Sequence, residues 1–103
     1  MVATTAVTAR VERSLRAVRG ELEDLPKVAE QWTSWTDLDR VDFSLEWDHL
    51  MADYLTELDE VYRGGQMTAD QQACYRALVR QLKDAQPLVE RLQLYPPPVS
   101  LDT

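Results

Sequence analysis

The stretch FSLEWDHLMADYLTELDEVYRGGQMTADQ, residues 43–71, combines a long helical pattern, a glycine pair and the start of a second helix. Its first part repeats apolar residues at intervals of three and four positions: Phe43, Trp47, Leu50, Tyr54, Leu58 and Val61. This spacing places them on one face of an amphipathic helix. It predicts a helix over residues 44–63, with Asp42 or Ser44 as the N-cap residue.

The glycine pair predicts a tight turn into a second long helix. Gly64 and Gly65 should end the first helix, because glycine takes the left-handed conformation at little cost. Thr68 with Gln71 three positions later forms a capping-box pattern. An apolar stripe then predicts a helix over residues 68–93, formed by Tyr75, Leu78, Leu82, Ala85, Val89 and Leu92. Pro87 should kink or restart it. So short a link favours an antiparallel hairpin.

The regions on either side of this hairpin complete the predicted fold. An apolar stripe predicts a first helix over residues 5–24, which Pro26 should end or bend. Residues 26–43 read as a connector with one or two short helical turns, because Leu38 and Val41 break the apolar phase of the helix that follows. Residues 96–103 begin with three prolines and predict an extended tail. We therefore expect an all-α bundle of three or four helices, with residues 1–95 as one domain.

Charge is distributed unevenly along this acidic chain, whose net charge is −7. Residues 1–20 carry four arginines and one glutamate, whereas residues 21–62 carry 13 acidic and two basic residues. The acidic segment suits a basic partner, or forms a solvated helix face partly paired with the arginines. The arginines Arg10, Arg13, Arg16 and Arg19 fan over half of their helix instead of forming a stripe. With the negative net charge, this argues against nucleic-acid binding.

The single cysteine and the hydropathy pattern set the expected compartment. Cys74 has no second cysteine with which to form an intrachain disulfide, which favours a reducing environment. The first ten residues lack the basic start of a secretory signal. No run of 18 apolar residues predicts a transmembrane helix. We expect a cytoplasmic protein that does not bind a membrane.

One pattern in the opening stretch predicts a metal site as an alternative. Glu46 stands three residues before His49, the only histidine, and Asp53 and Glu57 follow at helical spacing. Carboxylates and imidazole suit iron, manganese or zinc, and two copies of the stripe could meet in a symmetric dimer. Ferritin-like di-iron proteins use a Glu-x-x-His from each of two helices, whereas this chain has only one. The simpler interpretation is a charged helix face, so we expect no cofactor.

The connector supplies the candidate partner-binding residues: Trp32, Trp35, Asp37, Asp39 and Asp42. Tryptophan is enriched at binding hot spots, and the neighbouring acids suit a basic partner. No glycine-rich phosphate loop, zinc-finger spacing or Gly-x-Ser-x-Gly elbow is present. The sequence therefore predicts a non-enzymatic protein–protein interaction module, such as an adaptor, accessory subunit or acidic inhibitor. The long apolar stripes also predict a homodimer.

Overall fold

The computed structural model describes residues 5–101, which form helices and contain no strand. This confirms the prediction of an all-α bundle. The main elements are α1 (Thr5–Gln31), α2 (Asp37–His49), α3 (Thr56–Arg63), α4 (Ala69–Asp84) and α5 (Gln86–Arg91). A 3-10 turn at Trp32–Ser34 precedes α2, and a π-helical segment at Leu50–Leu55 joins α2 to α3.

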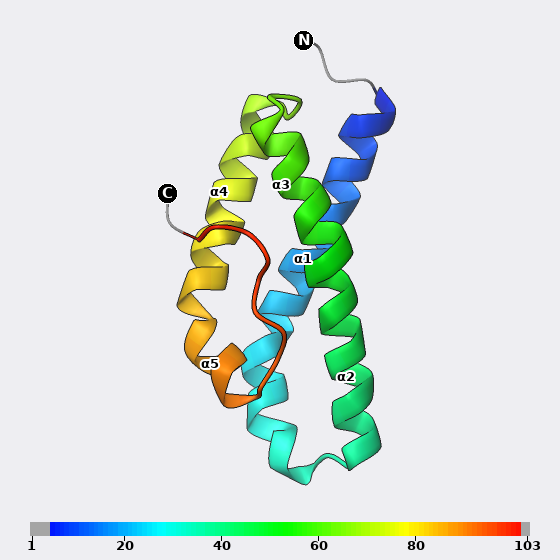
Figure 1. Ribbon diagram of the computed structural model, residues 1–103, viewed down its shortest axis with the longest axis vertical. Coiled ribbons are helices and arrows are strands. Elements are labelled where there is room, and N and C mark those ends of the chain that lie inside the picture. Colours follow the sequence, from blue (N-terminus) through cyan, green and yellow to red (C-terminus); the bar gives the residue numbers. More distant parts are fainter. Residues whose placement is uncertain (1–4, 102–103) are drawn as a thin grey trace.

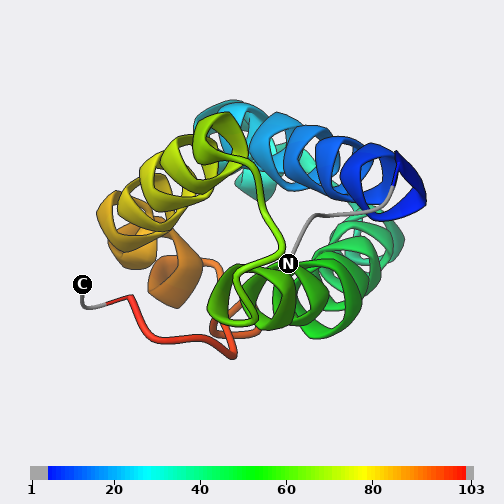
Figure 2. The same ribbon diagram turned by 90° about the horizontal axis from the view of Figure 1, so that it is seen from above.

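The elements form three columns, which Figures 1 and 2 show from the side and from above. The first column is α1, the second runs from α2 through α3, and the third runs from α4 through α5. Column one packs against α4 and against the π segment. The bundle measures 48 × 25 × 18 Å along its principal axes. None of the helices within residues 5–101 is both long enough and apolar enough to span a bilayer.

The core is made by the apolar stripes of all three columns. The side chains that are almost completely enclosed include Val18, Leu25, Trp47, Met51, Leu55, Leu58, Leu82 and Val89. The predicted stripes thus meet inside one chain. Ser14 and Gln71 are the buried polar residues within residues 5–101. The side-chain amide of Gln71 donates to the Thr8 carbonyl and to Glu12 at 3.2 Å each, and so ties α4 to α1.

Pro26 does not end the first helix, so the predicted boundary at residue 24 is wrong. The helix continues through Pro26 to Gln31. Leu25, Val28 and Ala29 on either side are buried, while the proline itself is exposed. Burying a leucine or valine contributes about 1.5–3 kcal/mol. Two such residues offset the roughly 3 kcal/mol that an interior proline costs.

The predicted connector over residues 26–43 is also wrong, because most of it is helical. Column two begins at Asp37, not at residue 44, and its N-cap residue is Thr36 instead of Asp42 or Ser44. Thr36 Oγ1 accepts from the Asp39 backbone N–H at 3.1 Å, and Asp39 Oδ2 accepts from the Thr36 N–H at 3.1 Å. This reciprocal capping box fixes the start of the helix.

The π segment shifts the buried face of the second column. It bonds one residue further back along the chain than an α-helix does, so it rotates the residues after it. Within the segment, Leu50, Met51 and Leu55 are buried, whereas Tyr54, which the stripe placed in the core, is only half-buried.

The turn between α3 and α4 follows the prediction. Gly65 has a φ of 71°, and the N–H groups of Gly65 and Gln66 donate to the carbonyls of Tyr62 and Val61. This is the Schellman arrangement, which satisfies carbonyls at a helix end. The capping box of Thr68 and Gln71 is present. The helical column breaks at Ala85, two residues before Pro87, which confirms the predicted restart.

The residues after α5 fold back over the bundle. Gln93 takes a φ of 57°, and a second Schellman arrangement reverses the chain there. In Figures 1 and 2 the tail runs between the second and third columns, on the side away from α1. Leu94 is buried, and Val99 and Leu101 pack against the core. The indole N–H of Trp47 donates to the Tyr95 carbonyl at 2.8 Å and holds the tail in place.

Candidate protein-interaction surface

Three large apolar side chains on α2 point away from the core. Leu38 is 70% exposed, Val41 51% and Leu45 61%. Their spacing of three and four residues places them on one side of the helix, opposite the buried Phe43 and Trp47. We call these three residues the α2 seam. Single exposed apolar residues are ordinary, whereas a row of three along one helix is a candidate interaction surface.

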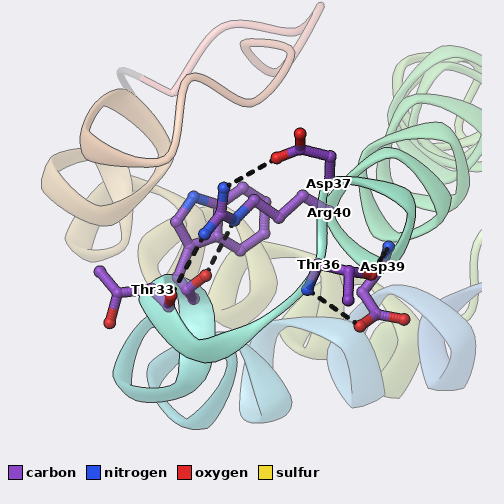
Figure 3. A network of polar contacts seen from close by, with 6 residues as sticks. Thr33, Thr36, Asp37, Asp39 and Arg40 are labelled. Atoms are coloured by element: carbon purple, nitrogen blue, oxygen red, sulfur yellow. Dashed lines mark hydrogen bonds and ion pairs between the residues drawn. The ribbon is translucent and has the colours of Figure 1, made fainter.

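The corner before α2 is held by Arg40, as Figure 3 shows. Its Nε donates to the Trp32 carbonyl at 2.9 Å, and its guanidinium lies 6.0 Å from the Trp32 ring centre. The same guanidinium donates to the Thr33 carbonyl at 3.3 Å and to Asp37 at 3.2 Å. The Arg40 side chain is thus fixed by backbone carbonyls and an aromatic ring of the 3-10 turn and by a carboxylate of α2. This network holds the first turns of α2, and therefore the seam, in one orientation.

Carboxylates flank the α2 seam on both sides. At 100° per residue, Asp42 lies on one side of the seam, and Asp37 and Asp48 lie on the other. Arg40 pairs with Asp37, but within residues 5–101 neither Asp42 nor Asp48 makes an ion pair. The seam is therefore an apolar row between two acidic edges.

An aromatic and acidic hollow of about 430 Å³ lies on the Asp42 side of the seam. Its lining residues are Trp35, Asp39, Asp42, Phe43 and Glu46. The rings of Trp35 and Phe43 meet edge to face, with their centres 6.1 Å apart. A cationic side chain suits such a hollow, because carboxylates attract it and an indole face contacts it favourably.

A second hollow, of about 380 Å³, lies on the other side of the seam. Val41 and Leu45 form one wall, and Trp32 and Leu92 contribute apolar surface from other elements. This hollow extends the apolar surface of the seam toward the end of α5. An apolar side chain from a partner can enter it beside the seam.

The predicted partner residues fall into two groups. Trp35, Asp39 and Asp42 come together in the acidic hollow, whereas Trp32 and Asp37 lie with Arg40. Both tryptophans are half-buried and pack against the core through ring contacts with each other and with Phe43. Whether they bind a partner stays a prediction.

The alternative metal residues do not gather into a site within one chain. His49 Nδ1 lies 2.7 Å from Asp53 Oδ2, whereas Glu57 pairs with Arg10 of α1 at 2.8 Å. The part of the chain that the structure describes contains no group of three or more acidic, histidine or cysteine side chains that could hold an ion. A site built from Glu46, His49, Asp53 and Glu57 would therefore need ligands from a second copy, as the sequence suggested.

Glu21 of α1 carries the most perturbed carboxyl group near α2. Burial raises the pKa of Glu21 to about 7 from an ordinary value of 4.5, and repulsion by Glu46 and Asp24 adds to the shift. Burial disfavours the charged form of a carboxyl group, as do like charges nearby. The carboxylate of Glu46 on α2 therefore acts on Glu21 of the neighbouring α1.

We predict that Glu21→Gln stabilises the protein at pH 8 but not at pH 4.5. A raised folded-state pKa gives stability that is fully present below the unfolded value of 4.5, and this stability is lost as pH rises through about 7. Allowing for screening by solvent, the gain at pH 8 is about 1 kcal/mol. Urea denaturation at both pH values measures it. The exposed Glu23→Gln on the same helix is the control, and an equal gain there at pH 8 would contradict the assignment.

The α2 seam is the part of this surface that sequence reasoning missed. Leu38 and Val41 were interpreted as a break in phase, because they do not continue the stripe that starts at Phe43. The signal was present: residues 36–39 form a Thr-x-x-Asp capping pattern, and the spacing from Leu38 through Val41 to Leu45 is helical. Two apolar faces on one helix, one for the core and one for solvent, explain both observations.

Comparisons of the chain with protein-family models, with curated proteins and with solved structures find no match.

Proposed function

We propose that this protein is a non-enzymatic protein-interaction module that docks another polypeptide on the α2 seam. The observation that carries the proposal is the row of exposed Leu38, Val41 and Leu45 on a helix whose opposite face is already in the core. The hollows on both sides of the row supply places for a partner's side chains. Clustered anchors beside pockets are typical of binding hot spots.

The packing of the core supports assigning the seam to a partner. The stripes of all three columns meet within one chain, so the bundle needs no further surface to close its core. The seam contributes nothing to that core, and its exposure costs free energy in water. A partner that covers the seam would recover this free energy.

The predicted homodimer is one form of this function. The long apolar stripes that predicted a homodimer meet within one chain instead. The α2 seam is the apolar face that remains for a second copy.

Cys74 is an exposed free thiol, which suits the reducing environment of the cytoplasm.

Photo-crosslinking in the host cell tests the proposal. A benzophenone amino acid would replace Val41 on the seam or, as the matched control, the exposed Ala77 on α4. We expect a discrete adduct from position 41 and none from position 77. The adduct should also disappear when Leu38 and Leu45 are changed to alanine. Equal labelling from both positions, or no adduct from position 41, would remove the seam as the docking site.

A further inference from the structure

We propose that the occupant of the α2 seam is a basic amphipathic helix of another protein. It would lay an apolar row on Leu38, Val41 and Leu45 and direct lysine or arginine side chains toward the acidic edges. This inference rests on the proposed function and names the chemistry of the partner. Helix-in-groove recognition uses anchors at the same spacing of three and four residues.

Charge complementarity is the first argument. Asp42 and Asp48 lie on opposite sides of the seam, and neither makes an ion pair within residues 5–101. The basic residues nearest in the sequence are already engaged: the Arg40 guanidinium is bound to Asp37 and to two backbone carbonyls, and His49 lies against Asp53. The seam therefore presents unpaired negative charge on both edges. Basic flanks on the partner would speed the encounter and fix its register.

The acidic hollow gives the second argument, because it suits a cationic side chain specifically. Three carboxylates, from Asp39, Asp42 and Glu46, surround the Trp35 and Phe43 rings at one edge of the seam. A lysine or arginine on the partner helix can place its aliphatic stem against the rings and its charge among the carboxylates. On the other edge, the hollow beside Val41 and Leu45 is more apolar and suits a leucine or methionine.

The same features disfavour a second copy of this chain. A symmetric pairing would bring the seam against itself, so Asp42 and Asp48 would face the same acids. Like charges placed opposite one another are used to suppress a wrong partner. The seam also spans only eight residues, or about 10 Å at a rise of 1.5 Å per residue. That length matches two turns of a single helix, whereas a standard interface buries about 800 Å² on each partner.

Three labelled 21-residue peptides test the inference on the full-length protein. The basic peptide is an alanine-rich helix with leucines at alternating spacings of three and four and lysines on both flanks. The acidic peptide replaces each lysine with glutamate. The scrambled peptide has the composition of the basic one, but its leucines are spread around the helix. Fluorescence anisotropy at 50 and 500 mM NaCl gives each affinity.

We expect the basic peptide to bind at least tenfold more tightly than the other two at 50 mM NaCl. Its affinity should fall at least fivefold at 500 mM NaCl, because salt screens exposed charges. Changing both Leu38 and Leu45 to alanine should weaken binding at least tenfold. Asp42→Asn with Asp48→Asn should weaken it about fivefold. The control pair Asp70→Asn with Asp84→Asn removes the same charge from α4 and should change the affinity less than twofold.

Several results would overturn the inference. The acidic or scrambled peptide could bind as tightly as the basic one, the α4 control could lose as much affinity as the α2 pair, or no peptide could bind at 100 μM. If the Val41 photo-adduct then persists, the docking function stands with an occupant of other chemistry. A dimer in sedimentation that is lost on changing Leu38 and Leu45 to alanine would identify a second copy as that occupant. Loss of the photo-adduct as well would remove the docking function itself.

Discussion

Replacing Trp47 with alanine should lower the free energy of unfolding by about 3–5 kcal/mol, the largest effect that we expect from a single substitution. Trp47 is fully buried, and its ring stacks on Phe43 with 6.4 Å between the ring centres. Its indole N–H also donates to the Tyr95 carbonyl, which joins the tail to the bundle. Alanine would leave a cavity and an unpaired carbonyl. Urea denaturation followed by circular dichroism measures the loss.

Trp47→Phe separates the two contributions. Phenylalanine keeps most of the apolar volume but cannot donate to the Tyr95 carbonyl, so we expect a smaller loss of about 1–3 kcal/mol. Hydrogen exchange of the Tyr95 backbone N–H should also become faster, because the tail loses its anchor. An alanine variant destabilised by less than about 1 kcal/mol would show that position 47 lies outside the core.

Leu82→Ala should lower the free energy of unfolding by about 2–5 kcal/mol. Leu82 is fully enclosed near the C-terminal end of α4, so its removal leaves a cavity among the three columns. The matched control is Leu38→Ala on the seam, which removes the same atoms from a side chain that is 70% exposed. We expect that control to change stability by less than about 0.5 kcal/mol.

This pair of leucines tests whether Leu82 of α4 lies in the core and Leu38 of α2 lies on the docking face. If Leu38→Ala destabilises the isolated protein as much as Leu82→Ala does, Leu38 belongs to a core and the seam is not free. If neither variant is destabilised, the predicted α4 stripe is not the core either. Thermal unfolding at two protein concentrations adds a check, because a dimer makes the midpoint depend on concentration.

Local signals predicted the long helices and their turn. The stripes in α3 and α4, the glycine pair and the capping box of Thr68 and Gln71 each depend on neighbours within a few residues. Such signals can be read directly because the same few residues form the contact. The restart near Pro87 followed for the same reason, since proline acts on the turn that precedes it.

The features that the sequence did not predict depend on distant residues. The α1 helix passes through Pro26 because the bundle buries Leu25, Val28 and Ala29. The π segment is not visible in a spacing that assumes one helical period throughout. Likewise, nothing near the tail indicates that the Tyr95 carbonyl meets Trp47, 48 positions earlier. In each case tertiary packing decides the local structure.

The candidate site was predicted only in part. Trp35, Asp39 and Asp42 are close along the chain and line one hollow, and their role in binding a partner stays a prediction. The sequence did not show that Arg40 would bond to the Trp32 carbonyl and to Asp37. Nor did it show that Leu38 and Val41 would face solvent on a helix that packs into the core through Phe43 and Trp47. A helix with two apolar faces can be recognised only when the position of the core is known.

The reactivity of a cysteine on the α2 seam is the most direct test of the central claim that another polypeptide covers this face. Val41→Cys places a thiol on the seam, and the exposed Cys74 on α4 is an internal reference in the same molecule. In the dilute purified protein, both thiols should react with a maleimide at similar rates. In the host cell, we predict that Cys74 keeps its rate while the thiol at position 41 reacts at least fivefold more slowly. An equal ratio of the two rates in both settings would contradict the claim.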